Sequence, residues 1–297
     1  MNQSTQNTKD RVTVALIQHA CPPGESTQAN FDRAADLIRE AAKRGAELAV
    51  TQELFTTPYF PQQESPANFD LAEPIPGPTT EALSALAGEL NIAISGSIFE
   101  KRAAGVYHNT SVLIDAAGQL LGRYRKLHIP DDPGFSEKFY FTPGDLGFQV
   151  LPAGGMNVGM LVCWDQWFPE AARLTAMQGA SLLLYPTAIG WVPADSPDEQ
   201  RQQWAAWRTM HQSHAIANGV FVAAVNRVGQ EGEVSFWGNS LVCDPSGAII
   251  AEASETEPQA LLAECDLTQI EQTRRHWPFL RDRRVDAYGP LTRRLVD

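Results

Sequence analysis

A buried strand that leads into a helix is predicted around Cys163, and this pattern strongly constrains the fold. The apolar run 159–163 ends at the thiol, and a turn follows before a helix that begins at Pro169. A side chain at such a strand-to-helix turn is presented for attack, with backbone N–H groups nearby that can bind an oxyanion. Free cysteine is also among the most often buried residues, so this pattern alone leaves a structural role for Cys163 open.

Two further apolar runs end at charged residues. Residues 48–52 lead to Glu53, and the strand-like segment 122–126 ends at Lys126 before a loop rich in proline, aspartate and glycine. Each is weak evidence alone, because a glutamate after a strand is often solvated and a lysine near arginines is usually surface charge. Together they bring a carboxylate, an ammonium and a thiol to strand ends, and such ends gather at one edge of an α/β sheet.

These three residues and their flanks resemble the Glu-Lys-Cys triad of the carbon–nitrogen hydrolase (nitrilase) superfamily. The resemblance extends over nearly the whole chain, from residue 12 to residue 288. Within the superfamily, segments 124–134, 137–145 and 163–170 are similar to those of the N-carbamoylputrescine amidohydrolases. The resemblance implies an α/β fold, a four-layer α-β-β-α sandwich. It also implies hydrolysis of N-carbamoylputrescine to putrescine, carbon dioxide and ammonia, a step of polyamine biosynthesis from agmatine.

The chemistry of the triad suggests a role for each residue. A thiolate divides amide or urea hydrolysis into two easier steps through an acyl-enzyme, and we expect Cys163 to be this nucleophile. Glu53 is expected to be the general base, while Lys126 and the backbone N–H of Trp164 stabilise the oxyanion. Glu137 matches an additional glutamate that the superfamily places beside its lysine. Without that match, a Glu–Lys pair on a solvated loop is an equal alternative.

The residues after the nucleophile favour a substrate with a neutral or cationic tail. Superfamily members that act on N-carbamoyl amino acids often carry arginine here to bind a carboxylate, whereas this chain has Gln166 and Trp167. We therefore expect an aromatic slot for a tetramethylene chain and an acidic partner for its ammonium. The aromatic candidates are Tyr59, Phe60, Phe135, Trp164 and Trp191, and the acidic candidates are Asp132, Asp195 and Asp198.

Two alternative functions stay open. The first is a related amidase or ureidase that acts on N-carbamoyl-β-alanine, N-carbamoyl amino acids or aliphatic amides. The second is a non-catalytic binding subunit that keeps the fold. All four candidate catalytic residues are present, which disfavours the second alternative because losing any one of them would cripple an acyl-enzyme mechanism.

Charge and composition limit the partners. The net charge of −12, from 23 basic and 35 acidic residues, disfavours nucleic acid and anionic membranes and is compatible with a cationic small-molecule substrate. The apolar runs are too short to span a bilayer, and the polar residues 1–10, expected to be frayed, lack the apolar core of a signal peptide. The four cysteines show neither CxxC spacing nor zinc-type pairing, which favours a reduced, cytoplasmic protein.

Other motifs give no reason to expect a cofactor or a metal. Residues 154–159 are rich in glycine but precede a strand, which is the wrong order for a dinucleotide-binding loop. His211 and His214 share a helix face, yet no third metal ligand is evident, so packing is the better interpretation.

Strands and helices alternate along the chain without a linker, so a single domain over residues 1–297 is predicted. Strands are predicted at 12–18, 47–52, 92–99, 110–114, 120–126, 158–162, 182–185, 221–225, 240–242, 248–251 and 260–265, and helices at 30–44, 79–89, 169–178 and 199–218.

The segment 274–297 carries seven arginines against three aspartates. In the superfamily such segments commonly pack across subunits, so the resemblance implies a homo-oligomer. RNA binding by segment 274–297 is a weaker alternative.

Overall fold

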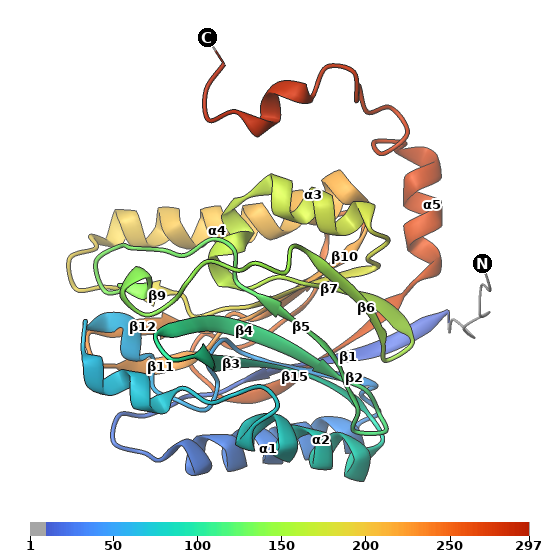
Figure 1. The fold of residues 1–297 in the computed structure, drawn as a ribbon. Helices are drawn as coiled ribbons and strands as arrows, with labels where there is room; N and C mark the ends of the chain where they lie inside the picture. Colours follow the sequence, from blue (N-terminus) through green and yellow to red (C-terminus); the bar gives the residue numbers. More distant parts are fainter. Residues whose placement is uncertain (1–9, 297) are drawn as a thin grey trace.

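The computed structural model describes residues 10–296, and residues 1–9 of the predicted frayed N-terminus lie outside this range. Two six-stranded sheets lie face to face, with helices on both outer faces (Figure 1). The predicted four-layer α-β-β-α sandwich is therefore confirmed. Of the helices in residues 10–296, none is both long enough and apolar enough to cross a membrane.

The first sheet has the strand order β15-β1-β2-β3-β4-β5. The strands β1, β2 and β3 pair in parallel, so β2 delivers its carboxyl end to the edge of the sandwich where Glu53 follows. The helices α1 and α2 cover the outer face of this sheet (Figure 1). The elements are β1 (Arg11–Gln18), α1 (Thr27–Lys43), β2 (Leu48–Thr51), α2 (Pro78–Leu90), β3 (Ala93–Ala103), β4 (Val106–Ile114), β5 (Leu120–Arg125) and β15 (Gln259–Asp266).

The second sheet has the order β14-β13-β10-β8-β7-β6. Its central strands β7, β8 and β10 are parallel, and β7 leads to Cys163. The helices α3 and α4 cover its outer face (Figure 1). The elements are β6 (Gln149–Ala153), β7 (Met156–Met160), α3 (Pro169–Met177), β8 (Leu182–Pro186), α4 (Pro197–Asn218), β10 (Phe221–Val225), β13 (Leu241–Cys243) and β14 (Ile249–Glu252).

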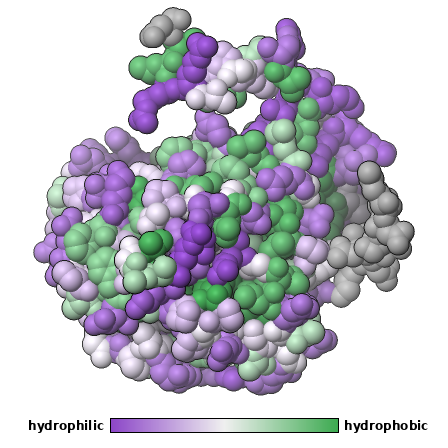
Figure 2. Space-filling view, in the orientation of Figure 1, coloured by the Kyte–Doolittle hydropathy of each residue, from purple (hydrophilic) through white to green (hydrophobic). Residues whose placement is uncertain are grey.

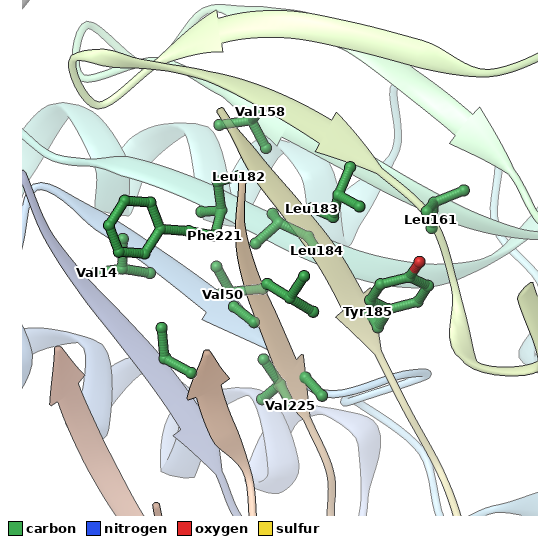
Figure 3. Close-up of a cluster of buried hydrophobic side chains, with 14 of the residues drawn as sticks. Val14, Val50, Val158, Leu161, Leu182, Leu183, Leu184, Tyr185, Phe221 and Val225 are labelled. Carbon is green, nitrogen blue, oxygen red and sulfur yellow. The ribbon is translucent and has the colours of Figure 1, made fainter. Parts of the chain in front are cut away.

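The largest cluster of buried apolar side chains includes the layer between the two sheets. Val14 and Val50 from the first sheet meet Leu182, Leu184 and Phe221 from the second, and all five are fully or almost fully buried (Figure 3). Burying a valine, leucine or phenylalanine side chain contributes about 1.5–3 kcal/mol. This layer therefore joins the sheets firmly and fixes the strand ends that carry the polar residues of the site.

The predicted strands and helices are present with shifts of a few residues at their ends, but several elements were missed. These are β6, the short β9 (Gly190–Trp191), β11 (Val228–Glu231), β12 (Val234–Trp237) and the helix α5 (Thr268–His276). Pro152 lies in β6, which is tolerated because β6 is an edge strand. The glycine-rich segment turns the chain from β6 into β7, since Gly154 and Gly155 both have positive φ.

Candidate active site

Glu53 lies in the turn after β2, and its side chain is fully buried. Its Oε1 accepts a hydrogen bond from Asn109 Nδ2 at 2.7 Å and another from Lys126 Nζ at 2.8 Å. Within residues 10–296, Glu53 Oε2 has no hydrogen-bond partner although it is buried. The carboxylate is thus held by one oxygen, and the other is available to accept a proton.

Lys126 follows β5 and lies between two carboxylates. Its Nζ donates to Glu53 at 2.8 Å and to Glu137 Oε2 at 2.6 Å, and all three side chains are buried. Burial alone would lower the pKa of Lys126, but the charges of Glu137 and Glu53 outweigh it and raise that pKa above its usual value. The lysine therefore stays a cation at neutral pH.

Glu137 begins a short 3-10 helix, Glu137–Phe139, and also accepts a hydrogen bond from Tyr59. The distance from Tyr59 Oη to Glu137 Oε1 is 2.7 Å. Burial raises the pKa of Glu137 to about 7, and Lys126 opposes this shift while Glu53 adds to it. Near neutral pH, Glu137 can therefore exist with or without its proton.

Cys163 begins another 3-10 helix, Cys163–Trp167, three positions after the last residue of β7 in the second sheet. Its φ of 42° is in the left-handed region, which is unusual for a residue with a side chain and is typical of strained turns at functional sites. Burial, reinforced by Glu53, raises the pKa of the Cys163 thiol well above its usual value, although Lys126 opposes this. The resting thiol is protonated and needs a base before it can attack.

The residues after Cys163 are fixed from two sides. Gln166 is buried, and its Oε1 accepts a hydrogen bond from Trp207 Nε1 of α4 at 2.9 Å. Its backbone oxygen lies 2.7 Å from His214 Nε2, also on α4. Asp165 is fully buried and accepts a hydrogen bond from the backbone N–H of Val162 at 2.9 Å. No role was predicted for Asp165 from the sequence, although an acidic residue two positions after a predicted nucleophile is a usable signal.

Arg227 is a second buried residue for which no role was predicted from the sequence. Its Nη2 donates to the backbone oxygens of Glu53 at 2.8 Å and Leu54 at 3.0 Å. Its Nη1 donates to both carboxylate oxygens of Glu231, at 2.8 and 2.7 Å. The guanidinium thus holds the turn that carries Glu53. Its position two residues after the apolar run 221–225 resembles the placement of the other polar residues near strand ends.

A cavity of about 470 Å³ opens beside these residues. Of the predicted site residues, the cavity is lined by Asp132, Phe135, Glu137, Cys163, Trp164 and Asp195. Its other walls are largely apolar and include Pro130, Ile189, Val192 and Ala206. A cavity of this size, with apolar walls and few polar groups, suits a small ligand.

Several predicted substrate-contacting residues lie outside the cavity lining. Tyr59 contacts Glu137 instead, and Phe60 stacks on Phe99 with ring centroids 4.9 Å apart. Trp191 packs against Trp237 at 5.3 Å and donates its indole N–H to a backbone oxygen of α4. Asp198 is exposed and pairs with an arginine in the first turn of α4.

His211 and His214 are both buried in α4 and pack against Tyr185. Burial lowers the pKa of each ring, so both are neutral at neutral pH. Across residues 10–296, no group of three or more His, Cys, Asp or Glu side chains is arranged to hold a metal ion.

The fold and the site together define a hydrolase class in which a cysteine, a lysine and carboxylates meet at the edge of a two-sheet sandwich. A family model described as carbon-nitrogen hydrolase matches residues 13–275. The chain therefore belongs to the carbon-nitrogen hydrolase family, whose members act on C–N bonds other than peptide bonds.

Known relatives match the chain over almost its full length. The N-carbamoylputrescine amidase of Oryza sativa subsp. japonica is 45% identical over 290 residues, covering 95% of this chain and 94% of that protein. A citrullinase of Francisella tularensis subsp. tularensis is 38% identical over 288 residues, covering 95% and 99%. The crystal structure of a carbon-nitrogen hydrolase from Helicobacter pylori G27 matches with a TM-score of 0.92 at 44% identity, covering 96% of this chain and 100% of that one.

Proposed function

We propose that this protein hydrolyses N-carbamoylputrescine to putrescine, carbon dioxide and ammonia. The observation that carries the proposal is the cavity, in which Cys163 and Glu137 share one largely apolar space with the exposed carboxylate of Asp132. The amidase from rice, at 45% identity, supports the same substrate. A ureido group at Cys163, an alkyl chain along the apolar walls and an ammonium near a carboxylate would fit this lining.

In the first half-reaction, Glu53 takes the thiol proton and the sulfur attacks the ureido carbon. The oxyanion that forms is stabilised by Lys126 and by the backbone N–H of Trp164. One C–N bond of the ureido group then breaks, and the leaving nitrogen takes the proton from Glu53. Glu53 next removes a proton from water, which attacks the carbamoyl thioester; the C–S bond breaks and the sulfur takes the proton back from Glu53, which restores the resting thiol. The carbamate product decomposes to carbon dioxide and an amine or ammonia.

Among the acidic candidates for the substrate ammonium, Asp132 is the best placed. Within residues 10–296 its carboxylate has no hydrogen-bond or ion-pair partner, and it is exposed to the cavity. Asp195 also lines the cavity, but its oxygens already accept hydrogen bonds from Val192 N at 2.9 Å and Gln203 Nε2 at 3.1 Å. An unpaired carboxylate gains more from a cationic ligand than one whose hydrogen bonds are already made.

The test is ammonia release from N-carbamoylputrescine, with L-citrulline, N-carbamoyl-β-alanine, N-carbamoyl-D-amino acids and an aliphatic amide in parallel. Citrulline keeps a ureido-alkyl chain but adds a carboxylate, and the citrullinase relative makes it the main competitor. We expect turnover of N-carbamoylputrescine to exceed that of every carboxylate-bearing substrate. Preferential turnover of citrulline would keep the mechanism and overturn the substrate.

The tail-binding role of Asp132 is tested with Asp132→Asn and with Asp131→Asn as its matched control. Asp131 is the exposed neighbour and does not line the cavity. We expect KM for N-carbamoylputrescine to rise about fivefold in Asp132→Asn and to stay unchanged in Asp131→Asn. A fivefold rise corresponds to the binding free energy of one partly exposed ion pair. Equal KM values in the two variants would place the ammonium elsewhere.

We also propose that the protein is a homo-oligomer held together by its C-terminal segment, residues 277–296. This segment extends away from the sandwich beyond α5 and exposes apolar side chains (Figures 1 and 2). The exposed residues include Trp277, Phe279, Val285, Leu291 and Leu295. Such a surface is characteristic of protein contacts. Light scattering on the full chain and on a chain ending at His276 tests this, and the same number of subunits per particle for the two would contradict it.

A further inference from the structure

Asp165 connects the turn that carries the nucleophile to the strand that carries Lys126. Besides the Val162 N–H, its Oδ2 accepts a hydrogen bond from Tyr124 Oη at 2.8 Å. Its Oδ1 accepts one from the backbone N–H of His128 at 3.1 Å and lies 2.7 Å from His128 Nδ1. The carboxyl group thus uses both oxygens and joins segments that are far apart in the sequence.

The two partners of Asp165 lie on either side of Lys126. Tyr124 is in β5, two residues before the lysine, and His128 is two residues after it. The His128 ring also stacks on Phe168, at the end of the nucleophile turn, with centroids 3.7 Å apart and planes 9° from parallel. Two independent contacts therefore hold the same two segments together.

The surroundings of Asp165 make this arrangement sensitive to displacement. Within residues 10–296 the carboxyl group has no lysine or arginine partner, and its buried oxygens depend on N–H and O–H donors and on the His128 ring. A buried polar group that loses a partner costs about 1–3 kcal/mol. Any relative movement of the two segments would break at least one of these bonds, so the network resists such movement.

We propose that Asp165 is a positioning residue that keeps the Cys163 thiol in register with the Lys126 ammonium. The oxyanion forms on the carbon that is bonded to Cys163, and it must lie against Lys126. A displacement of Cys163 relative to Lys126 would therefore destabilise the transition state rather than weaken substrate binding. The inference rests on Cys163 as the nucleophile of the proposed function, but it does not depend on which substrate is used.

The first test compares Tyr124→Phe with Tyr185→Phe. Both tyrosines are buried and both substitutions remove one hydroxyl, but the Tyr185 hydroxyl has no hydrogen-bond partner in residues 10–296. We expect kcat of Tyr124→Phe to fall about tenfold while KM stays nearly unchanged. A tenfold fall is the size expected from the loss of one hydrogen bond to a carboxylate. Tyr185→Phe should keep the kcat of the wild type.

The second test uses Asp165→Asn and the alkylation of Cys163 by iodoacetamide, followed by mass spectrometry across a pH series. We expect kcat to fall about 10²-fold, as for a misplaced catalytic group. The pH midpoint of alkylation should move upward, because a displaced Lys126 no longer stabilises the Cys163 thiolate. Alkylation does not require turnover, so this readout stays informative even if the substrate assignment fails.

Two results would overturn the proposal. One is equal kcat for Tyr124→Phe and Tyr185→Phe. The other is an Asp165→Asn protein that unfolds at lower temperature but keeps the wild-type kcat and alkylation profile per folded molecule, which would make Asp165 purely structural. If Asp165→Asn does not fold, the tyrosine pair decides the question alone.

Discussion

The turn after β2 and the turn after β7 each position one reactive side chain, but the first is held by an arginine and the second by an aspartate. Each carries one reactive side chain, and each contains a residue other than glycine in the left-handed region, Leu54 with φ 48° and Cys163 with φ 42°. The first turn directs backbone oxygens at the Arg227 guanidinium. The second directs a backbone N–H at the Asp165 carboxyl group.

This difference follows from what each turn must present to the substrate. A general base needs a free carboxylate oxygen. Arg227 can hold the first turn without blocking that oxygen, because it binds the backbone oxygens of Glu53 and Leu54 and not the carboxylate. A nucleophile needs N–H groups for its oxyanion, so the acceptor that holds the turn must use a different N–H from that of Trp164. Asp165 meets this condition by binding the N–H of Val162, which precedes the nucleophile.

The largest expected effect comes from removing the reactive side chain of either turn. Cys163→Ala and Glu53→Gln should each lower kcat by more than about 10⁴-fold, because nucleophile and base act as one unit. The double variant should be scarcely worse than either single variant. Steady-state ammonia release measures this, with circular dichroism to show that the fold is kept. A fully active Cys163→Ala protein would refute the mechanism.

The next largest effect concerns the cation that holds the first turn. Arg227→Met leaves Glu231 buried without its charged partner and removes the donors to two backbone oxygens, so we expect a loss of about 3–5 kcal/mol in the free energy of unfolding. Urea denaturation measures this loss. The control is Arg275→Met, which removes the exposed pair with Glu271 and should change stability by less than about 0.5 kcal/mol. Similar losses in both variants would contradict a special role for Arg227.

A smaller effect is expected from Glu137, which lies beside the lysine between the two turns. Its pKa is raised in the folded protein, so between pH 4.5 and about 7 the folded state binds more protons than the unfolded state. The contribution of Glu137 to stability is therefore lost as the pH rises through this window. In Glu137→Gln, the slope of unfolding free energy against pH should be less negative by up to about 1 kcal/mol per pH unit. Parallel slopes for variant and wild type would contradict the raised pKa.

The smallest effect is expected from a neutral hydrogen bond in the first turn. Ser97 Oγ accepts the N–H of Leu54 at 3.1 Å and donates more weakly to Asn109 Oδ1 at 3.3 Å, and Ser97→Ala removes both bonds. We expect stability to fall by about 1 kcal/mol and kcat to stay within about twofold of the wild type. A tenfold loss in kcat would show that the first turn depends on its N–H contact as well as on Arg227, and the contrast between the turns would then weaken.

The family resemblance predicted the four layers of the fold, whereas apolar runs of strand length that ended at chemically distinctive residues predicted which side chains lie at the sheet edge. Glu53 and Glu137 do both contact Lys126, while the roles of the three residues in catalysis stay predictions. Asp165 and Arg227 could not be assigned in the same way. Their contacts with Tyr124 and with the backbone of Glu53 span 41 and 174 positions, so the local signal at each position could not identify these distant partners.

The aromatic slot was the least predictable part of the site. Tyr59, Phe60 and Trp191 have the composition expected of a substrate pocket, but each ring packs inside the protein instead. An aromatic side chain serves a core and a pocket equally well, so only the three-dimensional arrangement distinguishes the two. Phe135 and Trp164, which were also predicted, do line the cavity, but much of its remaining wall consists of aliphatic residues and proline, which carry no distinctive sequence signal.

The protonated thiol of Cys163 also bears on how the protein withstands peroxide. Oxidation to sulfenic acid proceeds through the thiolate and requires access, and Cys163 is 4% exposed with a raised pKa. Cys21, Cys243 and Cys265 are buried as well, and burial raises the pKa of each to about 12. Burial and the raised pKa both slow oxidation of the resting thiol, whereas proton transfer from Cys163 to Glu53 during turnover would make the sulfur more reactive towards peroxide.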